Sequence, residues 1–91
     1  MFKPNPKAQV ELKFRELFGR DFKTKVLGHR VSQVDCKRIG IPCGSRDGMY
    51  VTELFVDGQL VAKSNHRDWR KAYKGLVLEV EKLFADGVAL V

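Results

Sequence analysis

The pair Asp57-Gly58 lies between two runs of strand-forming residues, and this feature constrains the fold more than any other. Asp and Gly suit the positive backbone angles of a two-residue hairpin turn. The flanking runs, residues 49–56 and 59–64, are rich in β-branched and aromatic residues, as strands are. We therefore expect a tight antiparallel hairpin. Counting outwards from the turn gives the cross-strand pairs Val56–Gln59, Phe55–Leu60 and Leu54–Val61.

The C-terminal part of the chain carries an apolar stripe at helical spacing. Its members recur every three or four residues and share one face of a helix: Trp69, Ala72, Tyr73, Leu76, Val80, Leu83 and Phe84. We expect this helix to begin with Asn65 as its N-cap and Asp68 in a capping-box position. It ends at Asp86-Gly87. Membership of the stripe places Trp69 in the core, in preference to a surface position where it would stack on a base.

The N-terminal half predicts a helix, a strand and a loop. Asn5-Pro6 is a strong helix start, because Asn caps free amides and Pro suits the first helical position. The apolar face of this helix comprises Val10, Phe14, Leu17 and Phe18, and Gly19 ends it. Residues 22–38 predict one strand, in which Gly28 is a candidate bulge. Residues 40–48 contain three glycines and a proline, which predicts a loop.

The resulting order is helix, strand, strand, strand, helix. We expect one α+β domain over residues 1–91, with a three-stranded antiparallel sheet and two helices packed on one face. Its core covers about residues 5–84, and residues 88–91 form an apolar tail. A chain of 91 residues is long enough for one core only. Without a signal peptide or the roughly 20 apolar residues of a membrane-spanning helix, we expect a soluble, cytoplasmic protein.

Residue types that carry catalysis or bind metals are sparse in this sequence. Cys36 and Cys43 are too few for a disulfide framework or a zinc site, so we expect reduced structural thiols. His29 and His66 are distant in sequence from both cysteines. No nucleophile with a paired base and no Gly-rich phosphate loop is evident. We therefore expect no metal, no cofactor and no enzymatic activity.

The positive charge is concentrated at the start of the C-terminal helix. The net charge is +6, and five cations lie between residues 63 and 74 beside a single acid, Asp68. These cations are Lys63, Arg67, Arg70, Lys71 and Lys74. At 100° per residue the last four share one solvent-facing arc of the helix. Such a patch favours an anionic partner.

Stability does not explain cations at this place. At a helix N-terminus they oppose the helix dipole, which costs ~0.3–1 kcal/mol each at exposed sites. The cations and the unpaired amides at that end all attract phosphate. We therefore interpret the run as a surface that contacts a nucleic-acid backbone. The alternative interpretation is an ordinary solvated helix face.

The order of elements, the hairpin over residues 50–58 and the helix-opening run together resemble the double-stranded RNA-binding domain family. In that family the second helix opens with a Ser-Lys-Lys-x-Ala-Lys pattern whose basic residues contact phosphates across the major groove. Here Asn-His-Arg-Asp-Trp-Arg, residues 65–70, occupies the pattern. The resemblance extends over about residues 5–84 and implies phosphate contacts from His66, Arg67 and Arg70. The chain departs from the family at His66, where the family has lysine, and at Trp69, where it has a small alanine.

The family also contacts RNA through its first helix and through a loop with a Gly-Pro-x-His motif, and the loop here has no histidine. The exposed candidates in the first helix are Gln9, Lys13 and Glu16, and Arg46 at the loop tip is a candidate phosphate contact. The implied partner is double-stranded RNA or another structured nucleic acid, with duplex DNA as a weaker alternative.

A second hypothesis is a protein-interaction, inhibitor or regulatory module that docks on an acidic partner or forms a homodimer. It would use the apolar tail or an exposed hairpin aromatic. Tyr50 and Phe55 are the candidates, and the alternation of the strand places them on opposite faces of the hairpin.

Overall fold

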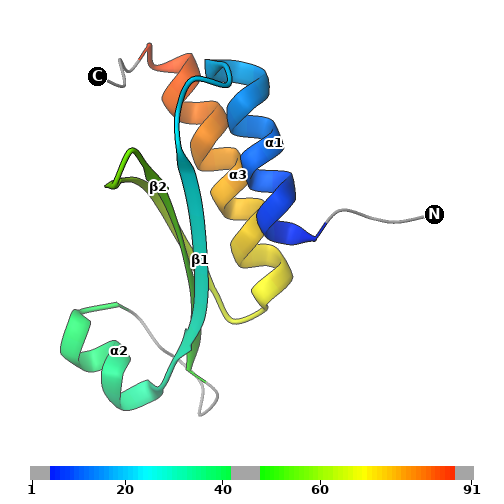
Figure 1. Cartoon of the computed structure of the whole chain (residues 1–91). Helices are drawn as coiled ribbons and strands as arrows, with labels where there is room; N and C mark the ends of the chain where they lie inside the picture. Colours follow the sequence, from blue (N-terminus) through cyan, green and yellow to red (C-terminus); the bar gives the residue numbers. More distant parts are fainter. Residues whose placement is uncertain (1–4, 42–47, 88–91) are drawn as a thin grey trace.

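A computed structural model describes residues 5–41 and 48–87, and Figure 1 shows their arrangement. The elements in chain order are α1 (Pro6–Phe18), β1 (Thr24–Val31), α2 (Gln33–Ile39), β2 (Met49–Val56), β3 (Gln59–His66) and α3 (Trp69–Ala85). The strands form one antiparallel sheet in the order β1-β2-β3. Helices α1 and α3 lie side by side on one face of it (Figure 1). The expected α+β class and the order of its main elements are confirmed.

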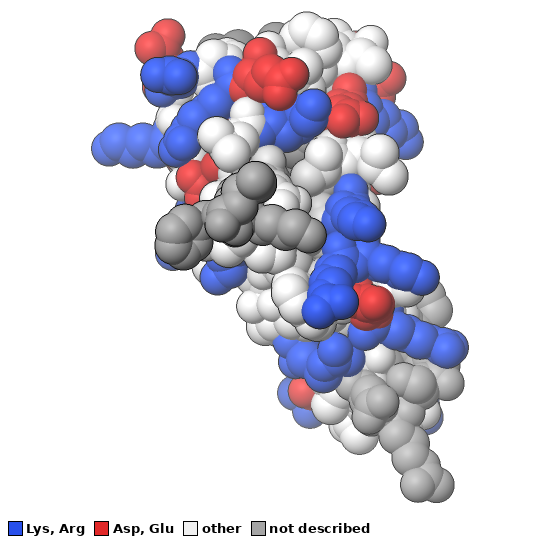
Figure 2. Space-filling model, turned by 90° about the vertical axis from the view of Figure 1, so that its right-hand side faces the viewer, with Lys and Arg blue, Asp and Glu red and all other residues white. Residues whose placement is uncertain are grey.

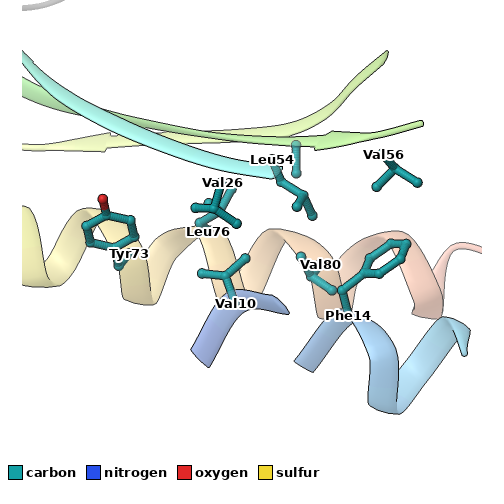
Figure 3. Packing of buried hydrophobic residues seen from close by; sticks show 9 residues of the cluster. Val10, Phe14, Val26, Leu54, Val56, Tyr73, Leu76 and Val80 are labelled. Atoms are coloured by element: carbon teal, nitrogen blue, oxygen red, sulfur yellow. The ribbon is translucent and has the colours of Figure 1, made fainter. Parts of the chain in front are cut away.

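The core lies between the sheet and these two helices (Figure 3). Val10 and Phe14 of α1 are fully buried, which confirms the apolar face predicted for the first helix. The sheet and both helices contribute the buried core residues: Val10, Phe14, Val26, Leu54, Val56, Ala62, Tyr73, Leu76 and Val80. We call the sheet face that carries Val26, Leu54 and Ala62 the inner face, and the opposite one the outer face.

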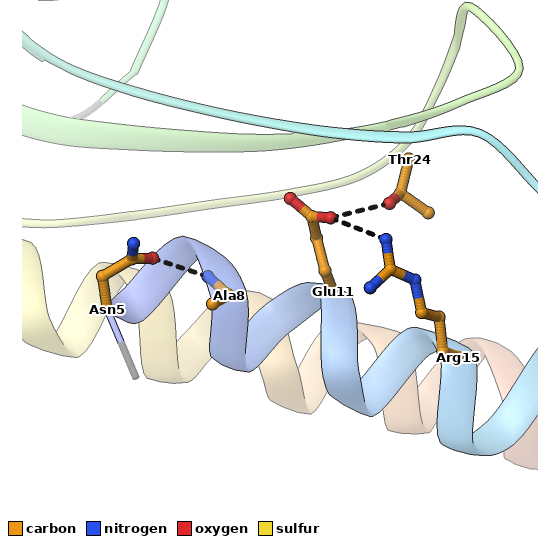
Figure 4. Close-up of polar contacts among 5 residues, drawn as sticks. All are labelled: Asn5, Ala8, Glu11, Arg15 and Thr24. Carbon is orange, nitrogen blue, oxygen red and sulfur yellow. Dashed lines mark hydrogen bonds and ion pairs between the residues drawn. The ribbon is translucent and has the colours of Figure 1, made fainter. Parts of the chain in front are cut away.

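Three polar contacts cap α1 and attach it to the sheet (Figure 4). At its start, Asn5 Oδ1 accepts a hydrogen bond of 2.7 Å from the Ala8 amide, and Pro6 is the first helical residue. This confirms the predicted N-cap. Farther along, the Glu11 carboxylate accepts a hydrogen bond of 3.0 Å from Thr24 Oγ1 and pairs with Arg15 at 3.2 Å. Glu11 therefore links α1 to the first residue of β1.

The predicted strand over residues 22–38 is wrong beyond Val31, because the chain turns into the short helix α2. Ser32 caps it, since Ser32 Oγ accepts a hydrogen bond of 3.2 Å from the Asp35 amide. Gly40, with φ 79°, ends it in the left-handed conformation. The β-branched residues of this stretch had favoured a strand, and the Ser and Gly caps override that preference.

Helix α2 lies near one end of the sheet, away from α1 and α3 (Figure 1). It contributes Cys36, a buried free cysteine, to a second small core with Val31 and Met49. The Cys36 thiol donates a hydrogen bond of 3.7 Å to the Val31 carbonyl. Cys43 and most of the predicted loop lie outside the described residues.

The hairpin turn is confirmed, with φ 51° at Asp57 and 84° at Gly58. The pairs Val56–Gln59 and Phe55–Leu60 form as predicted. Leu54, however, lies opposite Ala62 and not Val61, because the register shifts by one residue at this point. The extra residue of this bulge brings the small, buried Ala62 to the inner face.

Gly28 is not a bulge, since the β1–β2 register runs without a break from Thr24 to Val31. Its lack of a side chain serves a close approach instead. A Cβ atom built on Gly28 would overlap the Tyr73 hydroxyl and lie 2.7 Å from the Tyr50 hydroxyl. The glycine therefore makes room for these two rings between β1 and the start of α3.

Thr52 ties α3 to the sheet. This residue is fully buried. Its hydroxyl is the hydrogen-bond donor to two carbonyl oxygens, that of Ser64 at 3.1 Å and that of Ala72 at 3.2 Å. Ala72 is fully buried as well. The hydroxyl therefore joins β2, β3 and α3 at one point.

No helix within the described ranges is long and apolar enough to cross a membrane.

Candidate nucleic-acid interface

The junction between β3 and α3 differs from the predicted helix start. Strand β3 continues to His66, so that Asn65 pairs with Val51 in the sheet. The N-cap is Asp68, whose Oδ1 accepts a hydrogen bond of 2.9 Å from the Arg70 amide. The predicted Asn65 cap is wrong, because cross-strand pairing with β2 holds this residue extended. The helix therefore begins at Trp69, three residues later than expected.

His66 shapes the turn that connects the two elements. Its Nδ1 accepts a hydrogen bond of 3.0 Å from the Asp68 amide. An accepting Nδ1 carries no proton, so the proton of the neutral ring lies on Nε2. The side chain is exposed. His66 therefore both fixes the turn and presents an N–H donor at the surface.

Four cations surround this turn and are exposed: Arg67, Arg70, Lys71 and Lys74. Arg67 precedes the helix, and the others lie in the first two turns of α3. We call these residues the junction cations. Figure 2 shows Lys and Arg side chains gathered over this part of the molecule, with little acidic surface among them. The predicted charge patch therefore exists as a surface, although Arg67 joins it from the turn.

Arg30, at the end of β1, was not predicted and supports the same turn. One of its guanidinium nitrogens donates a hydrogen bond of 3.3 Å to the Arg67 carbonyl. The guanidinium also lies 5.8 Å from the centre of the Tyr50 ring. Arg30 is opposite Tyr50 in the sheet, so only the strand register, which the sequence did not predict, brings it to the junction.

The positive charge of the junction is not neutralised by neighbouring carboxylates. Across the described residues, the ion pairs involve Lys13, Arg15 and Arg38, and none involves a junction cation. The one acid in the run, Asp68, caps the helix through Oδ1. The four junction cations are thus available to an external anion.

Other predicted site residues lie elsewhere. Lys63 is opposite Glu53 in the sheet and follows the buried Ala62, which places it on the outer face, away from α3. Lys13 pairs with Glu16 at 3.6 Å and with Glu81 at 3.7 Å, and only 29% of its side chain is exposed. Lys63 therefore does not lie at the junction, and the charge of Lys13 is paired with two carboxylates.

Two further candidates add little to the interface. Gln9 is exposed on α1, one helical turn before Lys13. Glu16 is exposed on the same helix and pairs with Lys13. Arg46 lies outside the described residues. The candidate interface therefore consists of the junction cations and His66.

Trp69 is the other correction. It is 39% exposed and was expected in the core. As the first residue of α3 it lies beyond the part of the helix that covers the sheet, and the fully buried Ala72 takes the sheet-facing position. The Arg70 guanidinium lies 5.4 Å from the centre of the indole.

Tyr73 connects this surface to the sheet. Its ring lies 6.3 Å from Trp69, edge to face, and 5.7 Å from Tyr50. The two tyrosine hydroxyls are 3.2 Å apart and share a hydrogen bond. Burial, and then this bond, raise the pKa of the Tyr73 hydroxyl, so Tyr73 stays neutral and acts as part of the scaffold.

Among residues 5–41 and 48–87, no three His, Cys, Asp or Glu side chains lie together as a metal site. Comparison with protein-family models, with curated proteins and with solved structures finds no match for this chain. The functional interpretation therefore depends on the geometry of the junction itself.

Proposed function

We propose that this domain binds the phosphate backbone of a structured nucleic acid, with double-stranded RNA as the first candidate. One observation carries the proposal. Four exposed cations surround a single strand-to-helix junction, and the only acid among them caps the helix. A nucleic acid offers repeated phosphates at close spacing, so that several cations can be neutralised together and their counterions released.

The choice of RNA among the polyanions rests on the resemblance of the sequence to the double-stranded RNA-binding domain. The antiparallel hairpin and the helix that follows it occur in the order expected from the resemblance to the double-stranded RNA-binding domain. In that family, the start of this helix contacts phosphates across the major groove. Arg67 and Arg70 occupy basic positions of the family's pattern, while His66 supplies one N–H donor where the family has lysine. Recognition of this kind depends on the shape of the duplex and not on its sequence.

The first experiment is a charge reversal. In the variant Arg67→Glu, Arg70→Glu and Lys74→Glu, we expect affinity for duplex RNA to fall at least roughly 100-fold, since each lost phosphate contact weakens binding. The matched control reverses three exposed cations elsewhere: Arg20→Glu, Lys37→Glu and Lys82→Glu. It changes the net charge equally and should retain most of the affinity. If the two variants lose the same amount of affinity for duplex RNA, the loss is due to net charge alone, and the proposal is contradicted.

The salt dependence gives an independent measurement. With about four phosphate contacts, affinity should fall roughly 100-fold between about 50 and about 200 mM salt. Titrations with duplex RNA, duplex DNA and single strands under the same conditions rank the ligands. Binding of duplex DNA as tight as that of duplex RNA would contradict the preference for RNA and leave backbone binding in place.

The outer face of the sheet favours a second candidate function, docking of an acidic protein. Leu27 and Leu60 are 36% and 46% exposed on this face, and Phe55 is half-buried beside them. Lys25 and Lys63 lie on the same face, together with one acid, Glu53, which is opposite Leu27 and Lys63. Apolar side chains bordered by lysines suit a partner segment that is both apolar and acidic.

This second candidate makes a different prediction. The substitution Phe55→Ser removes apolar surface from the outer face and leaves the junction cations in place. It should abolish docking of such a partner and leave affinity for duplex RNA unchanged. Docking should also persist at salt concentrations that abolish phosphate binding. If binding of a protein partner is lost on charge reversal at the junction and is unaffected by Phe55→Ser, the outer face is not its docking site.

A further inference from the structure

Trp69 is a large apolar side chain exposed among the junction cations. Its exposure, 39%, contrasts with the complete burial of Ala72 one turn later. Its neighbours in sequence are Asp68, which caps the helix, and the exposed Arg70, whose guanidinium lies over the ring. Exposed aromatic rings beside cations are the usual platform on which single-stranded bases stack.

The indole is held by a row of rings that extends into the sheet. Trp69 packs edge to face on Tyr73, and Tyr73 is hydrogen-bonded to Tyr50. Tyr73 is only 5% exposed, and Gly28 provides the space in which the two tyrosines meet. A ring anchored in this way loses little conformational entropy when a ligand packs on it.

From this geometry we infer that Trp69 stacks on an unpaired base of the bound nucleic acid. The inference rests on the proposed function and specifies its ligand. Bases inside a duplex are already stacked on their neighbours, so the ligand must offer an unpaired nucleotide next to the duplex phosphates. The ligand class is therefore a duplex RNA with a single-stranded end.

Arg70 links the two parts of this site. Its guanidinium lies 5.4 Å from the centre of the Trp69 ring. The guanidinium lies over the indole ring, so a base would stack on the opposite face of the ring, and Arg70 would be close enough to attract the phosphate of the same nucleotide. Stacking and phosphate binding would then act on one nucleotide, which distinguishes the end of a duplex from its middle.

The test uses three RNA ligands with the same duplex of about 16 base pairs, the length that a double-stranded RNA-binding domain spans. One is blunt, one has a short single-stranded overhang, and one has the same overhang with abasic nucleotides. The last two carry equal numbers of phosphates and differ only in the bases. Binding is followed by anisotropy of labelled RNA and by the intrinsic fluorescence of Trp69, the one tryptophan of the chain.

We expect the wild-type protein to bind the overhang roughly 5- to 100-fold more tightly than its abasic counterpart, as loss of one base stack implies. Indole fluorescence should be quenched by the overhang and unaffected by the abasic ligand. Trp69→Ala should abolish the difference, and Trp69→Phe should retain part of it. Equal affinity for the two overhangs, with unchanged indole fluorescence, would overturn the inference without any need for a variant.

The outcomes also separate this inference from the proposed function. Equal affinity for all three ligands, lost on charge reversal at the junction, would overturn stacking and leave phosphate binding in place. The converse result is that the blunt duplex is not bound, whereas an isolated single strand binds and quenches the fluorescence of Trp69. That result would overturn the duplex-binding function and support stacking on Trp69.

Discussion

The two parts of α3 differ in how their charges are arranged. Residues 69–74 carry three cations and no acid, whereas residues 75–85 carry Glu79, Glu81 and Lys82. A helix is stabilised by acids in its first turn and by cations in its last. The later part follows this rule with Lys82 in the last turn, and the first turn contains no acid.

The contrast extends to packing. Leu76 and Val80 in the later part are fully buried, and Glu81 pairs with Lys13 of α1. In the earlier part, Ala72 and Tyr73 face the sheet and the remaining side chains are exposed. We conclude that residues 75–85 chiefly stabilise the fold, while residues 69–74 present charge at some expense of helix stability.

The largest effect should come from breaking the packing of the later part. Leu76→Ala should lower the free energy of unfolding by about 2–5 kcal/mol, because it leaves a cavity between helix and sheet. The matched control is Leu78→Ala, since Leu78 is the same residue type on the same helix and is 63% exposed. It should change stability by less than about 0.5 kcal/mol. The free energy of unfolding is measured by chemical denaturation. A similar decrease in the two variants would contradict the assignment of Leu76 to the core.

Two substitutions of Asp68, the N-cap of α3, distinguish the effect of the cap on stability from the effect of its charge on binding. Asp68→Ala removes the acceptor of the Arg70 amide and should lower the free energy of unfolding by about 0.5–2 kcal/mol. Asp68→Asn keeps a good cap and should change stability by only a few tenths of a kcal/mol. Both variants remove the one negative charge at the junction, so both should bind duplex RNA more tightly. Weaker binding by Asp68→Asn would indicate that the carboxylate itself contacts the ligand.

Much of the fold could be predicted because its signals are local. The Asp57-Gly58 turn, the Asn5 cap and the apolar face of α1 each lie within a few residues, and all are confirmed. The predicted face of α3 is confirmed for its buried middle part, whereas Trp69 and Phe84 at its two ends are 39% and 50% exposed. The short helix α2 was missed because β-branched residues outweighed its caps. The prediction of the hairpin register was wrong at Val61, because no local signal in the sequence marks a bulge there.

The candidate site was predicted in part. The basic run specified Arg67, Arg70, Lys71 and Lys74, and the structure brings them together. Its remaining features depend on contacts between distant segments. Arg30 reaches the junction through the β1–β2 register, and Trp69 is exposed because β3 displaces the helix start to a later residue.

A matched pair of lysines tests the charge arrangement directly. Lys71→Gln removes a cation from the first turn and should raise the free energy of unfolding by about 0.3–1 kcal/mol, while Lys82→Gln in the last turn should lower it by a similar amount. Lys71→Gln should also weaken RNA binding several-fold and reduce the salt slope by about 1. Lys82→Gln should leave both binding measurements unchanged. Effects of the same sign on stability would contradict the dipole argument.

The smallest effect concerns the ion pair that joins the later part of α3 to α1. Lys13 and Glu81 are 29% and 47% exposed, so solvent screens their attraction. Lys13→Gln should lower the free energy of unfolding by only about 0.2–1 kcal/mol. Because Glu16 and Glu81 already compensate its charge, the same variant should bind duplex RNA as the wild type does. If affinity instead falls as much as it does in Lys71→Gln, Lys13 exchanges its carboxylate partners for phosphate, and the interface extends from the junction along α1.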